Sequence, residues 1–324
     1  MGDRYERPEE SCPRRLEFLV ERPLCPRWLL EKLKRNSSRL MLPNRQQRGR
    51  VDELVRLHVQ CVAVQCSLKI RRTGLAAIWL VLCWLPVALC AADLNITYLA
   101  NEGVMINCRG GKVLVDALFR DSLDSYTRHS PEVQEKMETG KPPFDSVDLA
   151  LATHFHLDHW DAGAITRFLG SNPHAVFAST PTATAMLPWS QHEREHALWP
   201  AEGQRERLQV GSVSVQAFRL THGNTQNLGY RIAMCGETLV HLGDAEVSDA
   251  DMTVLLQLGA PDVAMVPYWW LLDPRGTDFI SRKWKPRYLV VLHFGSTDID
   301  SAKEIQAKWP QAWMATKQGE TRTF

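Results

Sequence analysis

Four side chains that can bind a metal ion lie within six residues of the segment Thr153–Gly163, namely His154, His156, Asp158 and His159. The segment follows an apolar run, Val147–Ala152, that predicts a buried strand. Three imidazoles and a carboxylate packed this closely are costly to desolvate without a common partner, and a divalent cation is the usual one. We therefore interpret the segment as part of a metal site rather than as a histidine-rich surface loop.

Three further metal-capable side chains occur singly later in the chain, each in an apolar context. His222 stands in Leu-Thr-His-Gly, Asp244 in His-Leu-Gly-Asp-Ala, and His293 in Val-Val-Leu-His-Phe. A surface loop that merely happens to be rich in histidine does not explain these three. The ordered set of seven is more specific than any one short motif.

The pattern His-x-His-x-Asp-His, followed by a lone His, a lone Asp and a lone His, resembles the metallo-β-lactamase superfamily of metal-dependent hydrolases. The resemblance spans about residues 94–293. It implies an α/β fold, a four-layer αββα sandwich, with a dinuclear site at one edge. The spacing by itself implies only a metal site.

The resemblance also implies a role for each of the seven side chains. Two sets of three each hold one ion and an aspartate bridges the ions: His154, His156 and His222; Asp158, His159 and His293; and Asp244. Two zinc ions are implied, although nitrogen and oxygen ligands also suit manganese or iron. The ions would share a hydroxide that attacks a carbonyl carbon or a phosphorus, and Asp158 would carry a proton to the leaving group. Metal ligation needs neutral imidazoles, so we expect metal and activity to be lost in mild acid.

The bridging aspartate narrows the expected substrate. In the superfamily that this chain resembles, the zinc β-lactamases proper carry another residue at the bridging position, often Cys. The lactonases, thioesterases and phosphodiesterases of that superfamily keep Asp. The segments around His222 and His293 resemble the lactonase-like and phospholipase-like branch. We expect an exported hydrolase of a small-molecule ester, lactone, thioester or phosphodiester. The alternatives are a β-lactam hydrolase and a non-catalytic binding protein on the same fold.

Aromatic residues near these motifs are candidates for a substrate-binding wall. Tyr268 and Trp269 follow the apolar run Val263–Val266, and Trp160 is adjacent to His159. An aromatic wall would suit a substrate with an apolar part. Ordinary packing is the alternative for large aromatics, which are mostly buried.

The elements that must position these residues alternate between strands and helices from Asp93 onward. The predicted strands are Leu94–Leu99, Gly103–Cys108, Lys112–Asp116, Val147–Ala152, Val213–Arg219, Tyr230–Met234, Thr238–His241, Val263–Val266 and Tyr288–Leu292. The predicted helices are Pro131–Thr139, Asp161–Leu169, a helix capped by Ser248 and ending at Leu258, and one capped by Ser301 and ending at Trp309.

A weak internal repeat joins two of these regions. The hairpins 103–117 and 229–245 both contain a Cys-Gly turn region and end in Asp-Ala. This suits a sandwich built from two similar halves. In the pairing, only Asp244 is expected to be a ligand, and Asp116 is expected to be structural.

Charge divides the chain near Ala92. Residues 1–92 carry 17 Lys and Arg against 9 Asp and Glu, whereas residues 93–324 carry 21 against 28. An acidic catalytic domain argues against nucleic acid as the substrate. We therefore expect a poorly ordered extension or mis-assigned start over 1–68, a signal segment over 69–92 and a hydrolase domain over 93–324.

The expected signal segment has a basic start, Lys69–Arg72, and an uncharged run, Gly74–Ala92, with Pro86 near its small-residue end. This order is typical of a secretory signal peptide, so we expect a periplasmic or secreted protein. The alternatives are an uncleaved segment that acts as a membrane anchor and a lipoprotein, for which Leu89 before Cys90 is a poor fit. Because 68 residues precede the segment, we hypothesise that translation starts near Val62, Val64 or Leu68.

Six of the eight cysteines lie before Ala92, which leaves Cys108 and Cys235 in the expected hydrolase domain as candidates for a disulfide. The chain contains no Cys-x-x-Cys pair, so the sequence supports neither a cysteine zinc knob nor a thioredoxin-like redox motif.

Overall fold

The structure is a computed structural model that describes residues 93–123, 125–188 and 193–324. The expected N-terminal extension and signal segment lie outside the described residues, so the domain boundary near Ala92 stays a prediction. Among the helices that the structure describes, none combines the length and the apolar character needed to span a bilayer.

Seven strands form the first sheet. They are β1 (Asn95–Ala100), β2 (Gly103–Cys108), β3 (Gly111–Val115), β4 (Leu149–Leu151), β5 (Val176–Ser179), β6 (Glu195–Ala197) and β14 (Thr321–Thr323). Their spatial order is β14-β1-β2-β3-β4-β5-β6. Neighbours from β14 to β3 are antiparallel, and those from β3 to β6 are parallel.

Seven strands form the second sheet as well. They are β7 (Glu206–Val210), β8 (Val213–Arg219), β9 (Leu228–Met234), β10 (Glu237–His241), β11 (Val263–Pro267), β12 (Tyr288–Leu292) and β13 (Trp313–Met314). Their spatial order is β13-β12-β11-β10-β9-β8-β7. Neighbours from β13 to β10 are parallel, and those from β10 to β7 are antiparallel. Each sheet is therefore mixed, with its hairpins on one side and its parallel strands on the other.

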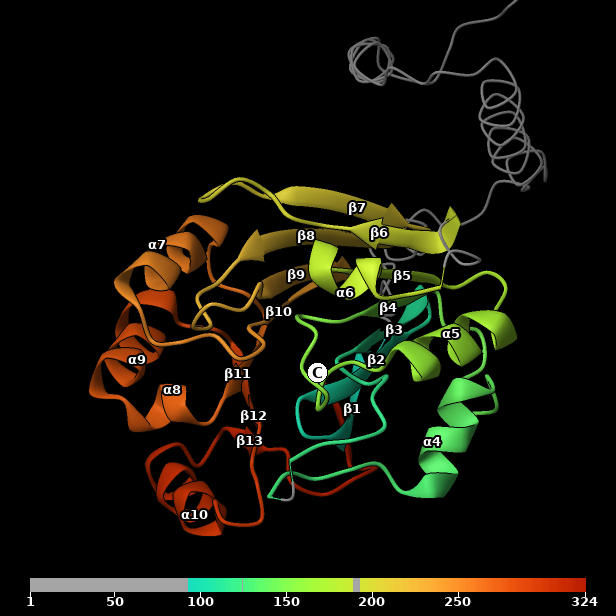
Figure 1. Cartoon of the computed structure of the whole chain (residues 1–324). Coiled ribbons are helices and arrows are strands. Elements are labelled where there is room, and N and C mark those ends of the chain that lie inside the picture. Colours follow the sequence, from blue (N-terminus) through green and yellow to red (C-terminus); the bar gives the residue numbers. More distant parts are fainter. Residues whose placement is uncertain (1–92, 124, 189–192) are drawn as a thin grey trace, which may run out of the picture. The chain divides into compact units, whose positions relative to one another are not determined.

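Helices cover the outer faces of both sheets. They are α4 (Pro131–Glu138), α5 (Ala162–Ser171), α6 (Pro181–Ala185), α7 (Asp249–Leu258), α8 (Trp269–Leu272), α9 (Pro274–Asp278), the π-helix η2 (Phe279–Trp284) and α10 (Ile299–Lys308). In Figure 1, α4 and α5 lie beside the first sheet, and α7 to α10 lie beyond the second. Two mixed sheets between helical layers are the αββα arrangement that the resemblance implies.

Three apolar layers hold this sandwich together. One lies between the sheets, and on β8 it takes every second residue, Val213, Val215 and Ala217, as the period of a strand requires. A second layer packs the other face of the second sheet against its helices. A third packs the first sheet against α5 through Ile165 and Phe168. Full burial of such a side chain stabilises the fold by about 1.5–3 kcal/mol.

Two predicted helix starts have opposite outcomes. Ser248 caps α7, because its hydroxyl accepts a hydrogen bond from the Asp251 amide at 3.0 Å. The predicted Ser301 cap is wrong, because α10 begins at Ile299 and Ser301 lies inside it. The physical reason is that the Asp298 carbonyl accepts a hydrogen bond from the Ala302 amide, which starts the helix earlier.

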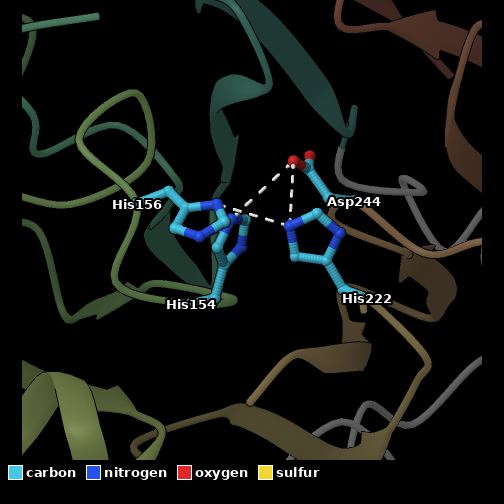
Figure 2. A group of neighbouring side chains, drawn as sticks. All are labelled: His154, His156, His222 and Asp244. Atoms are coloured by element: carbon cyan, nitrogen blue, oxygen red, sulfur yellow. Dashed lines mark hydrogen bonds and ion pairs between the residues drawn. The ribbon is translucent and has the colours of Figure 1, made fainter. Parts of the chain in front are cut away.

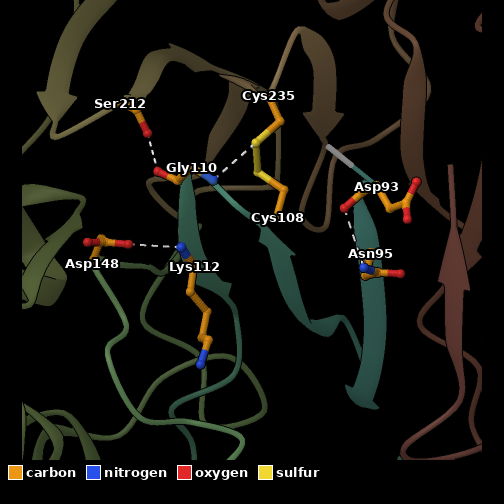
Figure 3. Close-up of a disulfide and its surroundings, with 8 residues drawn as sticks. All are labelled: Asp93, Asn95, Cys108, Gly110, Lys112, Asp148, Ser212 and Cys235. Atoms are coloured by element: carbon orange, nitrogen blue, oxygen red, sulfur yellow. Dashed lines mark hydrogen bonds between the residues drawn. A yellow bond between two sulfur atoms is a disulfide. The ribbon is translucent and has the colours of Figure 1, made fainter. Parts of the chain in front are cut away.

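The internal repeat corresponds to equivalent hairpins in the two sheets, β2–β3 and β9–β10. A disulfide joins Cys108, at the end of β2, to Cys235, in the turn before β10 (Figure 3). The sulfur of Cys235 also accepts a hydrogen bond from the Gly110 amide at 3.3 Å. The two sheets are therefore covalently tied at the turn ends of their hairpins.

Candidate metal centre

The seven metal-capable side chains meet where strands of both sheets end. His154 to His159 lie in the loop that follows β4, while His222 follows β8, Asp244 follows β10 and His293 follows β12. Loops at the carboxyl ends of strands are a common place for ligand sites in α/β folds. This set lies at the opposite end of β10 from Cys235.

The first set surrounds one oxygen of Asp244, as Figure 2 shows. Asp244 Oδ2 lies 3.7 Å from His154 Nε2 and 3.7 Å from His222 Nε2. His222 Nε2 in turn lies 3.3 Å from His156 Nδ1. Ligand atoms from all four residues lie within 4.8 Å of one another.

The second set surrounds the other oxygen of Asp244. Asp244 Oδ1 lies 3.2 Å from His159 Nε2 and 3.1 Å from His293 Nε2. Asp158 Oδ2 completes the set, at 3.5 Å from His159 Nε2 and 3.6 Å from His293 Nε2. One carboxylate therefore presents a different oxygen to each group of donors.

The donor atoms fit divalent cations. Four of these buried atoms have no hydrogen-bond partner in the structure: His154 Nε2, His159 Nε2, His293 Nε2 and Asp244 Oδ1. Bonds of about 2.0–2.2 Å to zinc place tetrahedral ligand atoms roughly 3.4 Å apart, which matches the separations above. Buried polar atoms without partners are costly, and a shared cation relieves that cost.

The charges at the site set protons and cations in competition. Burial lowers the pKa of His154 well below its ordinary value, and the neighbouring His159 adds to this effect. Burial opposes the shift at His159, but the carboxylates of Asp244 and Asp116 outweigh it and raise the pKa of His159 well above its ordinary value. Burial likewise opposes the shift at Asp244, where the imidazoles of His159 and His293 hold the pKa well below its ordinary range. A cation and a proton therefore compete for the ring nitrogen of His159.

Asp116 orients two of the candidate ligands. Its Oδ2 lies 3.0 Å from His159 Nδ1 and accepts a hydrogen bond from the Thr153 hydroxyl at 2.7 Å. That hydroxyl lies 3.0 Å from His154 Nδ1. With each Nδ1 held from behind, the two Nε2 atoms face the centre, which is how carboxylates commonly support histidine ligands. The sequence marked Asp116 only as the end of the repeated hairpin, and its positioning role was missed.

Asn101 plays a similar part for the second set. Its side-chain amide donates to Asp158 Oδ2 at 3.0 Å, and its backbone carbonyl accepts from the His293 backbone amide at 3.2 Å. Asn101 and His293 both have positive φ, at 49° and 66°, so the backbone bends at both residues. A lone asparagine in a turn carries no chemical signal, so no sequence pattern could have selected it.

The predicted substrate-wall residues lie in different surroundings in the structure. Trp269 donates from its indole to the Ala245 carbonyl at 2.9 Å, and its ring centroid lies 5.0 Å from that of His293. Tyr268 stacks on Phe294 at 5.3 Å. Trp160, by contrast, is 7% exposed and belongs to the core beneath α5. Trp269 is therefore the predicted aromatic that contacts the second set, and Tyr268 packs beside Trp269.

Tyr126 also lies at the centre and was missed. Its ring packs edge-on against His293 with 4.5 Å between centroids. A β-bridge to Gly295 and a hydrogen bond from the Ser296 amide to the Ser125 carbonyl hold it there. These contacts join residues about 170 positions apart, a distance at which no local pattern could have revealed them.

A family model described as a β-lactamase superfamily domain matches residues 112–294. This match covers more than half of the chain and includes all seven side chains. The chain belongs to the β-lactamase superfamily. All seven metal-capable side chains lie in the matched region and meet in groups that could hold a metal ion. With this family match and with metal-dependent hydrolases among the similar proteins, the chain is a metal-dependent hydrolase.

Individual members of the superfamily are distant from this chain. A metal-dependent hydrolase of Pyrococcus furiosus is 25% identical over 182 residues, which covers 54% of this chain and 76% of that protein. A metallo hydrolase from the archaeon Ignicoccus hospitalis has a TM-score of 0.52 at 21% identity, covering 72% of this chain and 98% of its own. A metallo-β-lactamase fold protein from Bacillus subtilis has a TM-score of 0.50 at 16% identity, covering 72% of this chain and 100% of its own. The two solved structures share the fold with this chain.

Proposed function

We propose that the protein is an exported hydrolase that holds two metal ions and cleaves an ester, lactone, thioester or phosphodiester bond in a small molecule. The observation that carries the proposal is the position of Asp244, whose two oxygens face two separate groups of donors. A single ion would leave one buried group without a partner, which is costly.

The donor chemistry favours zinc, and manganese or iron would also accept these nitrogen and oxygen ligands. Bound divalent ions would supply an activated water near neutral pH and would polarise the substrate oxygen. The protein's contribution is a rigid set of donors. Asp116 and Thr153 fix the imidazoles of His154 and His159, and Asn101 fixes the carboxylate of Asp158.

Asp158 is our candidate for proton transfer. Its Oδ2 is held by Asn101 and faces the second set. Its side chain is 9% exposed, so the carboxylate reaches the surface of the centre. We propose that it takes a proton from the attacking water and passes it to the leaving group.

The substrate class follows from the bridging aspartate and from the aromatic side chains. An aspartate at this bridge resembles the lactonase-like and phospholipase-like branch rather than the zinc β-lactamases proper. Trp269 and Tyr126 beside His293 give the centre an apolar side, which suits a substrate with an apolar part. Retention of all seven candidate ligands disfavours a non-catalytic binding protein.

Export is supported by two independent features. The segment 69–92 has the composition of a secretory signal. The Cys108–Cys235 disulfide belongs to a kind of bond that persists in oxidising compartments such as the periplasm or the extracellular space.

Metal analysis and a substrate panel test this proposal. We expect purified protein to contain two ions per chain, and we expect chelation or mild acid to remove both the ions and the activity. Turnover should occur within a panel of lactones, thioesters, simple esters and phosphodiesters. One ion per chain would contradict the dinuclear site, turnover of nitrocefin alone would favour a β-lactamase, and no turnover of any compound would favour a binding protein.

A further inference from the structure

A cavity of about 470 Å³ lies beside the metal centre. Its wall comes from the end of β8 and the loop after it, from the segment 199–203, and from α7. The candidate ligand His222 is part of this wall. Thr225 is also part of it, and its hydroxyl lies 3.3 Å from Nε2 of the candidate ligand His156. The cavity and the metal centre therefore share a boundary.

Arg219, the last residue of β8, is the single arginine or lysine among the residues that line this cavity. Its guanidinium lies 4.1 Å from the centroid of the Trp199 ring. Its Nε is buried and has no hydrogen-bond partner in the structure. The contact with the indole holds the guanidinium in place, while its Nε–H has no protein acceptor in the structure.

The two acids in the wall do not neutralise Arg219. Asp251 is 3% exposed, and its carboxylate accepts hydrogen bonds from the amide and the hydroxyl of Thr221. Its carboxylate is therefore engaged by Thr221 rather than by Arg219. Glu202 is exposed to solvent. A cation next to an active centre, held in place but lacking an acidic partner in the structure, is suited to bind an anion.

We propose that this cavity is a subsite for an oxyanion of the substrate, a carboxylate or a phosphate, and that Arg219 determines specificity for it. The inference rests on the proposed hydrolase function, because the bond to be cleaved would lie at the metal centre. A planar guanidinium offers paired N–H donors that match the two oxygens of a carboxylate or a phosphate. Its position against Trp199 restricts its motion, so little freedom is lost when the anion binds.

Arg231 provides a matched control. It lies on the neighbouring strand β9, is half-buried, and also has a buried Nε without a hydrogen-bond partner in the structure. It does not line the cavity. Arg231→Gln therefore removes a similar positive charge from the same sheet and leaves the proposed subsite intact.

Binding of simple anions to the metal-loaded protein tests the subsite without catalysis. Inorganic phosphate and succinate are titrated by calorimetry into wild type, Arg219→Gln, Arg219→Lys and Arg231→Gln. We expect Arg219→Gln to weaken the binding of at least one anion by about tenfold or more, the size expected for a hydrogen bond to a charged group. Arg219→Lys should weaken it less, and Arg231→Gln should leave it unchanged.

Anion binding at the metal ions persists in every variant, so it cannot imitate this pattern. Equal affinities in Arg219→Gln and wild type, or equal losses in Arg219→Gln and Arg231→Gln, would overturn the proposal. Thermal unfolding of each variant separates a loss of binding from a loss of fold. If Arg219→Gln unfolds, Arg219→Lys replaces it in the test, because lysine retains the positive charge but lacks the paired N–H donors.

Kinetics with matched p-nitrophenyl esters then tests specificity. The acyl chain ends in a carboxylate, in the corresponding methyl ester or in a phosphate monoester, and its length is varied. Wild type should prefer one anionic end, and Arg219→Gln should reduce that preference about tenfold while turnover of the neutral ester is retained. An equal rate loss for charged and neutral esters would contradict the subsite. If wild type cleaves none of the esters, ester hydrolysis as the proposed function fails, and the binding titration still decides whether the subsite exists.

Discussion

Asp116 and Asp244 each follow the last strand of a repeated hairpin within three residues, but their surroundings differ. Both oxygens of Asp116 accept hydrogen bonds from Thr153, and one also lies 3.0 Å from His159 Nδ1. The oxygens of Asp244 face imidazole Nε2 atoms instead, and Oδ1 has no hydrogen-bond partner in the structure. One carboxylate is satisfied by the protein, and the other keeps a buried oxygen without a hydrogen-bond partner in the structure.

This difference shows how one motif can serve two purposes. A carboxylate surrounded by fixed donors positions its neighbours, whereas a carboxylate surrounded by imidazole nitrogens is suited to share a cation with them. The loop after β4 produces both situations. Thr153 donates hydrogen bonds to Asp116, whereas the Nε2 atoms of His154 and His159 face Asp244.

Asp244→Asn should have the largest effect. The amide keeps the shape of the side chain but removes the charge that both donor sets share, so we expect loss of metal and a fall in activity of at least about 10³-fold. Metal content and turnover of the best substrate in the panel provide the measurement. Two tightly bound ions in this variant would show that Asp244 does not bridge.

Replacing both disulfide cysteines by serine sharpens the comparison at the other end of the hairpins. We expect the free energy of unfolding to fall by about 2–4 kcal/mol, because the cross-link closes a long loop. Activity should stay within about twofold of the wild-type activity, because Cys235 lies at the opposite end of β10 from Asp244 and distant sites act independently. Urea unfolding and steady-state kinetics measure the two quantities, and a large loss of activity in a folded variant would contradict the separation.

Asp116→Asn should have a smaller effect than Asp244→Asn. Loss of a carboxylate behind a metal ligand typically reduces metal affinity or activity by about 10–100-fold. Titration with zinc, together with kcat and KM at saturating zinc, distinguishes weaker metal binding from misplaced ligands. A loss as large as that of Asp244→Asn would mean that Asp116 is itself a ligand.

His129 lies in the same half of the molecule as Asp116 and should make a smaller contribution, which is to the pH dependence of folding stability. Its Nε2 lies 2.8 Å from the Ala117 carbonyl, and burial lowers its pKa from 6.5 to about 4. Between these pH values the unfolded chain binds a proton at His129 and the folded chain does not. The contribution of His129 to the free energy of unfolding is therefore present above pH 6.5 and is lost as the pH falls toward 4. Between pH 7 and pH 5 we expect a loss of about 2 kcal/mol from this group.

Comparison with His129→Gln isolates this contribution, and both proteins should carry Asp244→Asn so that metal release does not add to the pH dependence. Urea unfolding at the two pH values should show a smaller loss in the His129→Gln protein. Parallel pH dependences in both proteins would show that the ring is not held neutral.

Local pattern was sufficient for most of the elements and for the identity of the candidate ligands. The strand Val213–Arg219 and the cap at Ser248 lie where the sequence predicts them, because alternation and capping depend on neighbouring residues alone. Short edge strands such as β6 and β13 carry too few residues for a pattern, and they form because a neighbouring strand supplies hydrogen bonds.

The sequence by itself determined which atoms are available: nitrogen and oxygen donors in a spacing typical of one superfamily. Only the tertiary structure decided that Asp116 orients the imidazole of His159, while Asp244 faces the donor nitrogens. It also decided that Trp160 is buried in the core and that Tyr126 and Asn101 contact candidate ligands. The unpaired Arg219 beside Trp199 belongs to the same group. The physical reason is that a side chain's role depends on whether its hydrogen bonds and charge are satisfied, and the atoms that satisfy them come from distant parts of the chain.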